Sequence, residues 1–213
     1  MKHTGLAVIE SNWLRKQNIS VRGLFDLVAN IACENPNAYH YEMANSEAGL
    51  KEAIPRIGAY PECRYLCLAM HGDFDGLQTL SGQRLSRTEL RNLLSQIKDT
   101  DRSKLRGLHL GSCLFASERL AAFLFEREIG VHWIAGYSKE VDWLDSSAMD
   151  LLFLNELLNH NDMTEIQRIE GTASRLLDIA AGLVRDLGFG IFVRKRRTGG
   201  IKNLLTSAYL EEE

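Results

Sequence analysis

The 213-residue sequence lacks the features that mark membrane-spanning, secreted or nucleic-acid-binding proteins. It has only three prolines, and no apolar run comes near the roughly 20 residues that a membrane-spanning helix needs. Polar residues interrupt the amino-terminal stretch MKHTGLAVIESNW, so we expect no signal peptide there. The net charge of −3 gives the chain no general attraction to nucleic acid or to an anionic membrane surface.

The cysteines also lack a pattern that would serve as a structural framework. Cys33, Cys63, Cys67 and Cys113 form no CxxC pair and show no spacing typical of disulfide-rich domains. Three of the four lie inside apolar segments, where free cysteine commonly behaves as a small hydrophobic residue. This usage fits a reducing compartment, and we expect the protein to be cytoplasmic.

No internal repeat, low-complexity segment or linker divides the chain. Its content of 45% hydrophobic and 25% charged residues is ordinary for a globular protein. A chain of 213 residues is long enough to bury one sizeable core. We therefore predict a single domain spanning residues 1–213.

Short apolar runs alternate with segments of helical spacing. The predicted strands are Leu6–Ile9, Ala38–Met43, Arg64–Met70, Leu105–Leu110, Val131–Gly136 and Phe189–Val193. The predicted helices are Ile19–Cys33, Ser46–Ile57, Ser86–Ile97, Ser117–Ile129, Asp145–Asn159, Thr164–Leu187 and a short Ile201–Leu210. Ser86 and Glu89 have the spacing of a capping box, and Thr79–Leu85 is typical of a small hairpin. This order predicts an α/β sandwich, with a mostly parallel sheet of about six strands covered by helices on both faces.

Two of the apolar runs end in reactive side chains. Arg64–Gly72 reads RYLCLAMHG and ends in His71 and Gly72, whereas Leu105–Cys113 reads LRGLHLGSC and ends in Cys113. Nearly continuous apolar runs are typical of strands buried on both faces of a parallel sheet. Chemistry in such sheets gathers where the carboxyl ends of neighbouring strands meet. If the two strands are neighbours, His71 and Cys113 face one crevice.

This pair of residue types suits nucleophilic catalysis. A thiol near its ordinary pKa is a weak nucleophile at neutral pH, so it needs a base or a stabilised thiolate. His71 can take the proton of Cys113 and later donate a proton to a leaving amine. The helix predicted soon after Cys113 can favour its thiolate. The backbone N–H groups of Gly72 and Cys113 could form an oxyanion hole, which typically contributes on the order of 3 kcal/mol per donor.

The order of these two motifs resembles that of the caspase-like cysteine peptidases, a clan that includes caspases, separases, clostripain and the CHAT domains. The resemblance rests on MHG at 70–72 and GSC at 111–113, and on LQTLSGQRLSRTEL, which is similar to the hairpin and helix before the cysteine strand of CHAT domains. It covers roughly Leu6–Leu158. Ser112 departs from the alanine or glutamine often found before the cysteine, and Leu114–Phe115 replaces a glycine-bearing loop.

The resemblance implies a caspase-like three-layer sandwich and a cysteine endopeptidase that works through a thioester intermediate. His71 would be the general acid/base, Cys113 the nucleophile, and the Gly72 N–H an oxyanion donor. It implies a polypeptide substrate and neither an organic cofactor nor a metal. A peptidase domain this small, without recognition domains, commonly needs an activating partner, processing or a signal. A role in bacterial defence or programmed death, as in some CHAT-type proteins, would rest on analogy alone.

The substrate pocket is harder to predict. In the clan, the loop after the strand that follows the cysteine helix often lines the first pocket, and here that loop is Tyr137–Asp145. It supplies the candidate substrate-binding residues Glu140, Asp142, Trp143 and Asp145. Such acids would favour Lys or Arg in the substrate. Alternatively, they cap the helix that starts near Ser146.

Three other functions compete with this prediction. His71, Asp73 and Asp75 could bind a metal together with His109 and His132, although Asp73 and Asp75 also suit a turn. Gly111–Phe115 is similar to a nucleophile elbow, which would need a later histidine such as His132 or His160. Finally, the domain could be an inactive caspase-like module that only binds partners.

The sequence has one basic cluster, at Arg194–Arg197. It could contact nucleic acid or an acidic partner, or form a solvated strand end balanced by Glu211–Glu213. We favour the solvated strand end, and the oligomeric state stays open. Trp13 and Trp133 are interpreted as core residues.

Overall fold

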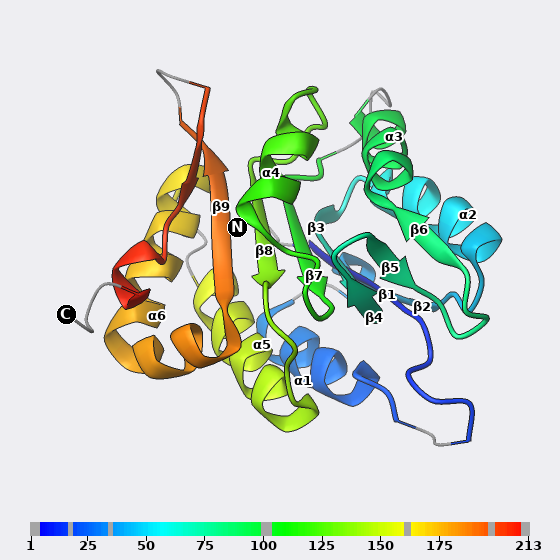
Figure 1. The fold of residues 1–213 in the computed structure, drawn as a ribbon, viewed down its shortest axis with the longest axis horizontal. Helices are drawn as coiled ribbons and strands as arrows, with labels where there is room; N and C mark the ends of the chain where they lie inside the picture. The colour runs from blue at the N-terminus through cyan, green and yellow to red at the C-terminus, as the bar shows by residue number, and fades with distance from the viewer. Residues whose placement is uncertain are drawn as a thin grey trace.

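The computed structural model describes residues 5–16, 19–33, 36–98, 104–159, 163–195 and 199–209. In these ranges a seven-stranded sheet has the order β10-β9-β8-β7-β3-β1-β2 (Figure 1). Its strands are β1 (Gly5–Glu10), β2 (Tyr39–Met43), β3 (Cys63–Ala69), β7 (Gly107–Gly111), β8 (Trp133–Tyr137), β9 (Phe189–Arg194) and β10 (Ile201–Asn203). Within this sheet, β2, β1, β3, β7 and β8 pair in parallel in that spatial order. β9 and β10 are antiparallel to their neighbours.

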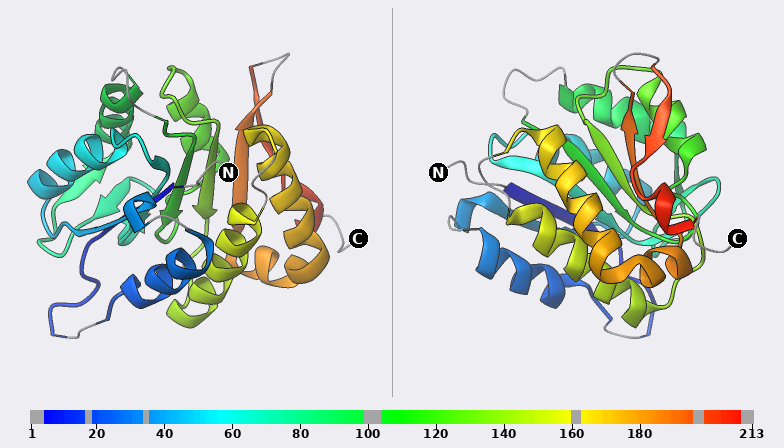
Figure 2. Two further views of the ribbon diagram at one scale, coloured as in Figure 1. Left: turned by 180° about the vertical axis from the view of Figure 1, so that it is seen from behind. Right: turned by 90° about the vertical axis from the view of Figure 1, so that its left-hand side faces the viewer.

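Helices cover both faces of this sheet, which confirms the predicted sandwich. α1 (Arg22–Ala32), α5 (Trp143–Leu158) and α6 (Glu165–Leu187) pack on one face. α2 (Glu47–Gly58), α3 (Arg87–Lys98) and α4 (Glu118–Phe125) pack on the other. Figure 2 shows the two helical layers separated by the sheet. None of the helices in the described ranges is both long and apolar enough to cross a bilayer.

The central strands are apolar throughout because each of their faces meets a helical layer. In β3, Leu66 and Leu68 pack with α2 and α3, whereas Tyr65 and Cys67 pack in the cluster that contains α1 and α5. A strand buried on two faces reads as a continuous apolar run rather than as an alternating one. This explains why the Arg64–Met70 and Leu105–Leu110 runs predicted their strands correctly.

A second, three-stranded antiparallel sheet projects from the end of β3. It consists of β4 (His71–Asp73), β5 (Gly76–Gln78) and β6 (Arg84–Ser86). The hairpin predicted at Thr79–Leu85 is the turn between β5 and β6. The predicted capping box at the start of α3 is also present, because Ser86 N donates to Glu89 Oε2 at 2.9 Å and Glu89 N donates to Ser86 Oγ at 3.3 Å.

The structure corrects the end of the chain and three helix boundaries. The helix predicted at Ile201–Leu210 is wrong: β10 pairs with β9, and a 3-10 turn, η2 (Thr206–Tyr209), follows. The backbone of β9 offers hydrogen-bond partners to an extended segment, and the left-handed φ of +68° at Gly199 allows the chain to reverse. α4 ends at Phe125 rather than near Gly130, α1 starts at Arg22, and α5 starts at Trp143. A short 3-10 turn, η1 (Pro36–Ala38), precedes β2.

Candidate active site

The strands that precede His71 and Cys113 are neighbours in the sheet. β3 and β7 pair in parallel with Ala69 opposite Gly111, and Met70 N donates to Gly111 O at 3.3 Å. His71 and Cys113 each lie two residues beyond this last pair. The structure therefore brings the two predicted catalytic residues to the same edge of the sheet.

Gly72 fixes how closely the two chain segments approach. A Cβ atom at this position would lie 2.8 Å from the carbonyl oxygen of Cys113 and 2.9 Å from Cβ of Ser112. Contacts this short with backbone force the segments apart, so only glycine fits. The His71 and Cys113 segments are thus packed directly against each other.

This contact gives a first prediction. We expect Gly72→Ala to destabilise the fold by about 1–3 kcal/mol, because the added methyl group overpacks a backbone contact. Urea unfolding of the variant measures the loss. Gly171→Ala is the matched control, since a Cβ there meets nothing within 4 Å. Equal stability of the Gly72→Ala variant and the wild type would contradict the close packing.

The loop after β1 contacts His71. The exposed imidazole places Nε2 at 2.7 Å from the carbonyl oxygen of Trp13, and the two rings make an edge contact with centroids 5.2 Å apart. A carbonyl oxygen can only accept, so Nε2 carries the proton and Nδ1 of the neutral ring is the acceptor. Trp13, interpreted from sequence as a core residue, is half-buried and belongs to the site.

Cys113 lies in a tight turn between β7 and α4. Its thiol donates to the carbonyl oxygen of Val141 at 3.9 Å and shares no hydrogen bond with His71 in the described residues. The next residue, Leu114, has φ of +62°, the one positive φ outside glycine in the described ranges. Such a backbone conformation costs on the order of 1 kcal/mol or more, and this strain lies beside the candidate nucleophile.

A narrow cleft of about 40 Å³ opens beside Cys113. Its walls come from the loop after β1, the ends of β3, β7 and β8, and the start of α5. Two buried polar atoms of lining residues, Ser112 Oγ and Trp143 Nε1, have no hydrogen-bond partner in the described chain. This is room for a few water molecules, since one water needs about 10–15 Å³ of such volume.

Among the predicted substrate-binding residues, Trp143 lines the cleft. Glu140, Asp142 and Asp145 are exposed and are absent from its lining. Asp142 is instead the N-cap of α5, because its Oδ1 accepts from Leu144 N at 2.8 Å. For Asp142 the alternative interpretation, helix capping, is the one the structure shows. The residue preferred in the substrate stays a prediction.

Sequence analysis missed a carboxylate that does line the cleft, Asp150. It is buried on α5, where its Oδ1 accepts from Tyr137 Oη at 2.6 Å and lies 2.9 Å from His109 Nε2. Burial and the charge of Asp150 raise the pKa of Tyr137 well above its ordinary value. The available signal was a charged residue among Met149, Phe153 and Leu154, on the apolar face of a helix.

The structure separates the residues of the competing sites. His109 is 1% exposed and paired with Asp150, whereas Asp73 closes a turn by accepting from Asp75 N and Gly76 N. His132 precedes β8 at the sheet edge opposite Cys113, so it cannot act as its base. The described residues contain no group of three metal-ligand side chains. His160 and Arg196–Arg197 lie outside the described residues.

These features define a caspase-like α/β fold, as the sequence resemblance predicted. Two solved structures of C11 cysteine proteases, which belong to the caspase-like clan, are similar to it. One is a secreted C11 protease from Bacteroides thetaiotaomicron in complex with an irreversible peptide inhibitor, with a TM-score of 0.52 and 10% identity over 90% of this chain and 66% of that one. The other, a secreted C11 protease from the same organism called iotapain, has a TM-score of 0.54 and 10% identity over 91% of this chain and 67% of that one.

The chain thus spans about two thirds of the length of these proteases. No family model matches the sequence, and no curated protein matches it. At 10% identity the similarity establishes the fold alone.

Proposed function

We propose that this protein is a cysteine endopeptidase in which Cys113 is the nucleophile and His71 the general acid/base. The observation that carries the proposal is the packing of Gly72 on the carbonyl of Cys113 at the end of the paired strands β3 and β7. The caspase-like fold and its similarity to peptidases support it. The unpartnered Ser112 hydroxyl and Trp143 indole N–H offer polar contacts to a bound peptide.

The proposed reaction starts with transfer of the Cys113 proton to Nδ1 of His71. The thiolate attacks the scissile carbonyl carbon, and the N–H groups of Gly72 and Cys113 stabilise the oxyanion. The imidazolium then gives its proton to the leaving amine, the C–N bond breaks, and a thioester is left. Water, deprotonated by His71, cleaves the thioester and releases the acid and the free thiol.

The carbonyl oxygen of Trp13 would position His71 in this reaction. Its contact with Nε2 holds the tautomer in which Nδ1 is free to accept a proton. In the same loop, the Trp13 side chain narrows the cleft. We therefore propose that a peptide substrate or an activating partner must displace this side chain before hydrolysis begins.

The closed cleft equally supports a second candidate, a caspase-like module that binds partners without catalysis. In that case the thiol contact with Val141 and the 40 Å³ cleft are the permanent state of the site. Reactivity of Cys113 toward a peptide electrophile separates the two candidates, because only a catalytic site binds the peptide and activates the thiol beside it.

The test is labelling with a peptide acyloxymethyl ketone, followed by mass spectrometry of the labelled cysteine. We expect the label on Cys113, its loss in Cys113→Ala, and much slower labelling in His71→Ala. Cys33→Ala is the matched control, since Cys33 is also a partly exposed thiol and burial raises its pKa. Labelling that persists in Cys113→Ala would refute the nucleophile. Absence of the label from both the wild type and Trp13→Ala, in which the side chain that narrows the cleft is removed, would identify the binding module.

A cytoplasmic location stays a proposal. It is supported by the four cysteines, none of which forms a disulfide bond. The two similar proteases are described as secreted.

A further inference from the structure

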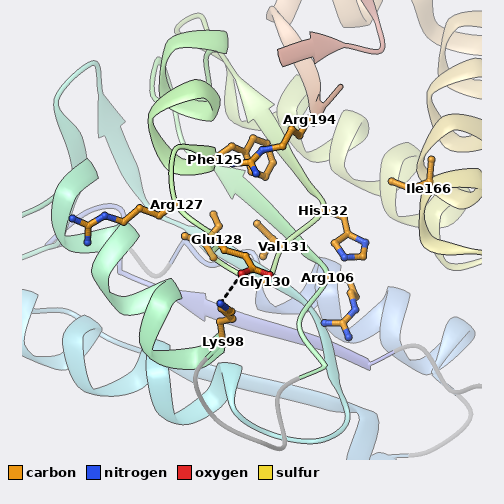
Figure 3. A pocket seen from close by; sticks show the side chains of 11 residues that line it. Lys98, Arg106, Phe125, Arg127, Glu128, Gly130, Val131, His132, Ile166 and Arg194 are labelled. Atoms are coloured by element: carbon orange, nitrogen blue, oxygen red, sulfur yellow. Dashed lines mark hydrogen bonds and ion pairs between the residues drawn. The ribbon is translucent and has the colours of Figure 1, made fainter. Parts of the chain in front are cut away.

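A second pocket, of about 600 Å³, lies at the edge of the sheet opposite Cys113 (Figure 3). Arg106 and His132 form one wall, directly before β7 and β8, and Arg194 closes the other side at the end of β9. Phe125, Ile129, Val131 and Ile166 supply apolar surface. The volume falls in the range of roughly 300–1,000 Å³ that is typical of small-molecule sites.

Positive charge dominates the lining of this pocket. The lining includes four cationic residues, Lys98, Arg106, Arg127 and Arg194, and a single carboxylate, Glu128. Lys98 pairs with Glu128 at 2.8 Å. Within the described part of the chain, no carboxylate lies within ion-pair distance of the three arginines. Among the described residues, therefore, the three arginines of the pocket have no carboxylate that neutralises them.

Two of these arginines are held in place. Arg106 Nη1 donates to the carbonyl oxygen of Leu105 at 2.7 Å, and the guanidinium of Arg194 lies 5.8 Å from the centre of the Phe125 ring. The Arg106 backbone is fixed between strands, because its N–H donates to Arg64 O and its carbonyl accepts from His132 N. In Figure 3, by contrast, Arg127 extends away from the centre of the pocket.

The neighbouring histidine lies among charged groups of both signs. Partial burial lowers the pKa of His132 most, the charges of Arg106 and Arg64 lower it further, and the charge of Glu165 opposes them. At neutral pH the ring is therefore neutral and adds a hydrogen-bonding group to the wall that carries Arg106.

We propose that this pocket binds a small polyanion that bears phosphate groups. Guanidinium groups on two walls match a ligand with anionic groups at both ends, since planar Arg forks recognise phosphate by paired hydrogen bonds. The cations line a concavity rather than an extended stripe, which favours a small molecule over nucleic acid. The pocket and Cys113 lie at opposite ends of β7, whose five residues span about 16 Å, so the site is separate from the candidate dyad.

The test is calorimetric titration of the whole chain with tripolyphosphate. We expect saturable 1:1 binding, weakened about tenfold in Arg106→Gln and in Arg194→Gln, because each change removes a charge-assisted contact. Arg175→Gln, on the exposed side of α6, is the matched control and leaves binding unchanged. Absence of saturable binding, or equal weakening in all three variants, would overturn the proposal.

A second measurement uses the wild type alone. Addition of tripolyphosphate should move the NMR signal of the His132 ring and raise its pKa, because a bound anion stabilises the imidazolium. Binding that leaves His132 unchanged would place the anion elsewhere. An oligonucleotide that binds more tightly than tripolyphosphate, with the same dependence on Arg106, would identify a nucleic-acid site and overturn the small-molecule proposal.

Discussion

Replacing Cys113 by alanine is expected to lower the rate of peptide hydrolysis by about 10³-fold or more, because no other group at the β3–β7 edge can form the thioester. His71→Ala should cause a loss of similar size, since the thiol then has no base and the leaving amine no acid. The double variant should be no slower than either single variant, as is typical of residues that act as one unit. Release of a fluorophore from a mixed peptide library measures the three rates.

The control for this series is Cys33→Ala, which should keep the wild-type rate. Hydrolysis that persists in Cys113→Ala would contradict the proposed nucleophile. Losses that multiply in the double variant would mean that His71 and Cys113 act independently. Either result would leave the fold intact and remove the dyad.

The second large effect concerns the anchor of the loop that covers the site. Glu10 is fully buried at the end of β1, and its carboxylate accepts from Trp13 Nε1 at 2.9 Å, Ser20 Oγ at 2.7 Å, Val21 N at 3.0 Å and Tyr41 Oη at 2.6 Å. Glu10→Ala leaves these donors without their acceptor in or beside the core. We expect a loss of about 3 kcal/mol in the free energy of unfolding, measured with urea.

The control for the anchor is Glu42→Ala. Glu42 pairs with Arg56 on the surface, so its loss should cost under about 1 kcal/mol. A further readout comes from Tyr41, whose pKa is raised to about 12 by burial and by its hydrogen bond to Glu10. In Glu10→Ala the pKa of Tyr41 should fall. Equal stability of the two variants, with an unchanged Tyr41, would show that Glu10 does not anchor the loop.

Features that depend on local pattern were predictable from sequence. The six predicted strands follow from apolar runs that end at turn residues, and the capping box follows from the spacing of Ser86 and Glu89. The sequence placed His71 and Cys113 in one crevice only on the condition that their strands are neighbours, which the pairing of β3 with β7 fulfils. β10 was missed because a strand of three residues carries too little pattern, and its conformation depends on pairing with β9. Local propensity is overridden where a sheet edge offers hydrogen bonds.

The rest of the site depends on contacts between distant segments. Trp13 reaches His71 only because Glu10 folds the loop back, and Asp150 reaches the cleft only because α5 crosses the end of β8. Neither contact corresponds to a recognisable spacing of residues in the sequence. The acidic residues of Tyr137–Asp145 could be recognised as a cluster in the sequence. The same pattern, however, is expected both for a helix N-cap and for a substrate pocket.

The candidate dyad is divided between two sheets, with Cys113 after the large sheet and His71 in the small one. The relative position of thiol and imidazole is therefore set by the contact between two separately hydrogen-bonded sheets, at Gly72 and Cys113, rather than by one secondary-structure element. A displacement of about 1 Å can change a rate by about 100-fold. Leu77 in β5 and Leu85 in β6 are fully buried side chains of the small sheet, and substitutions there would consequently change turnover without touching the substrate.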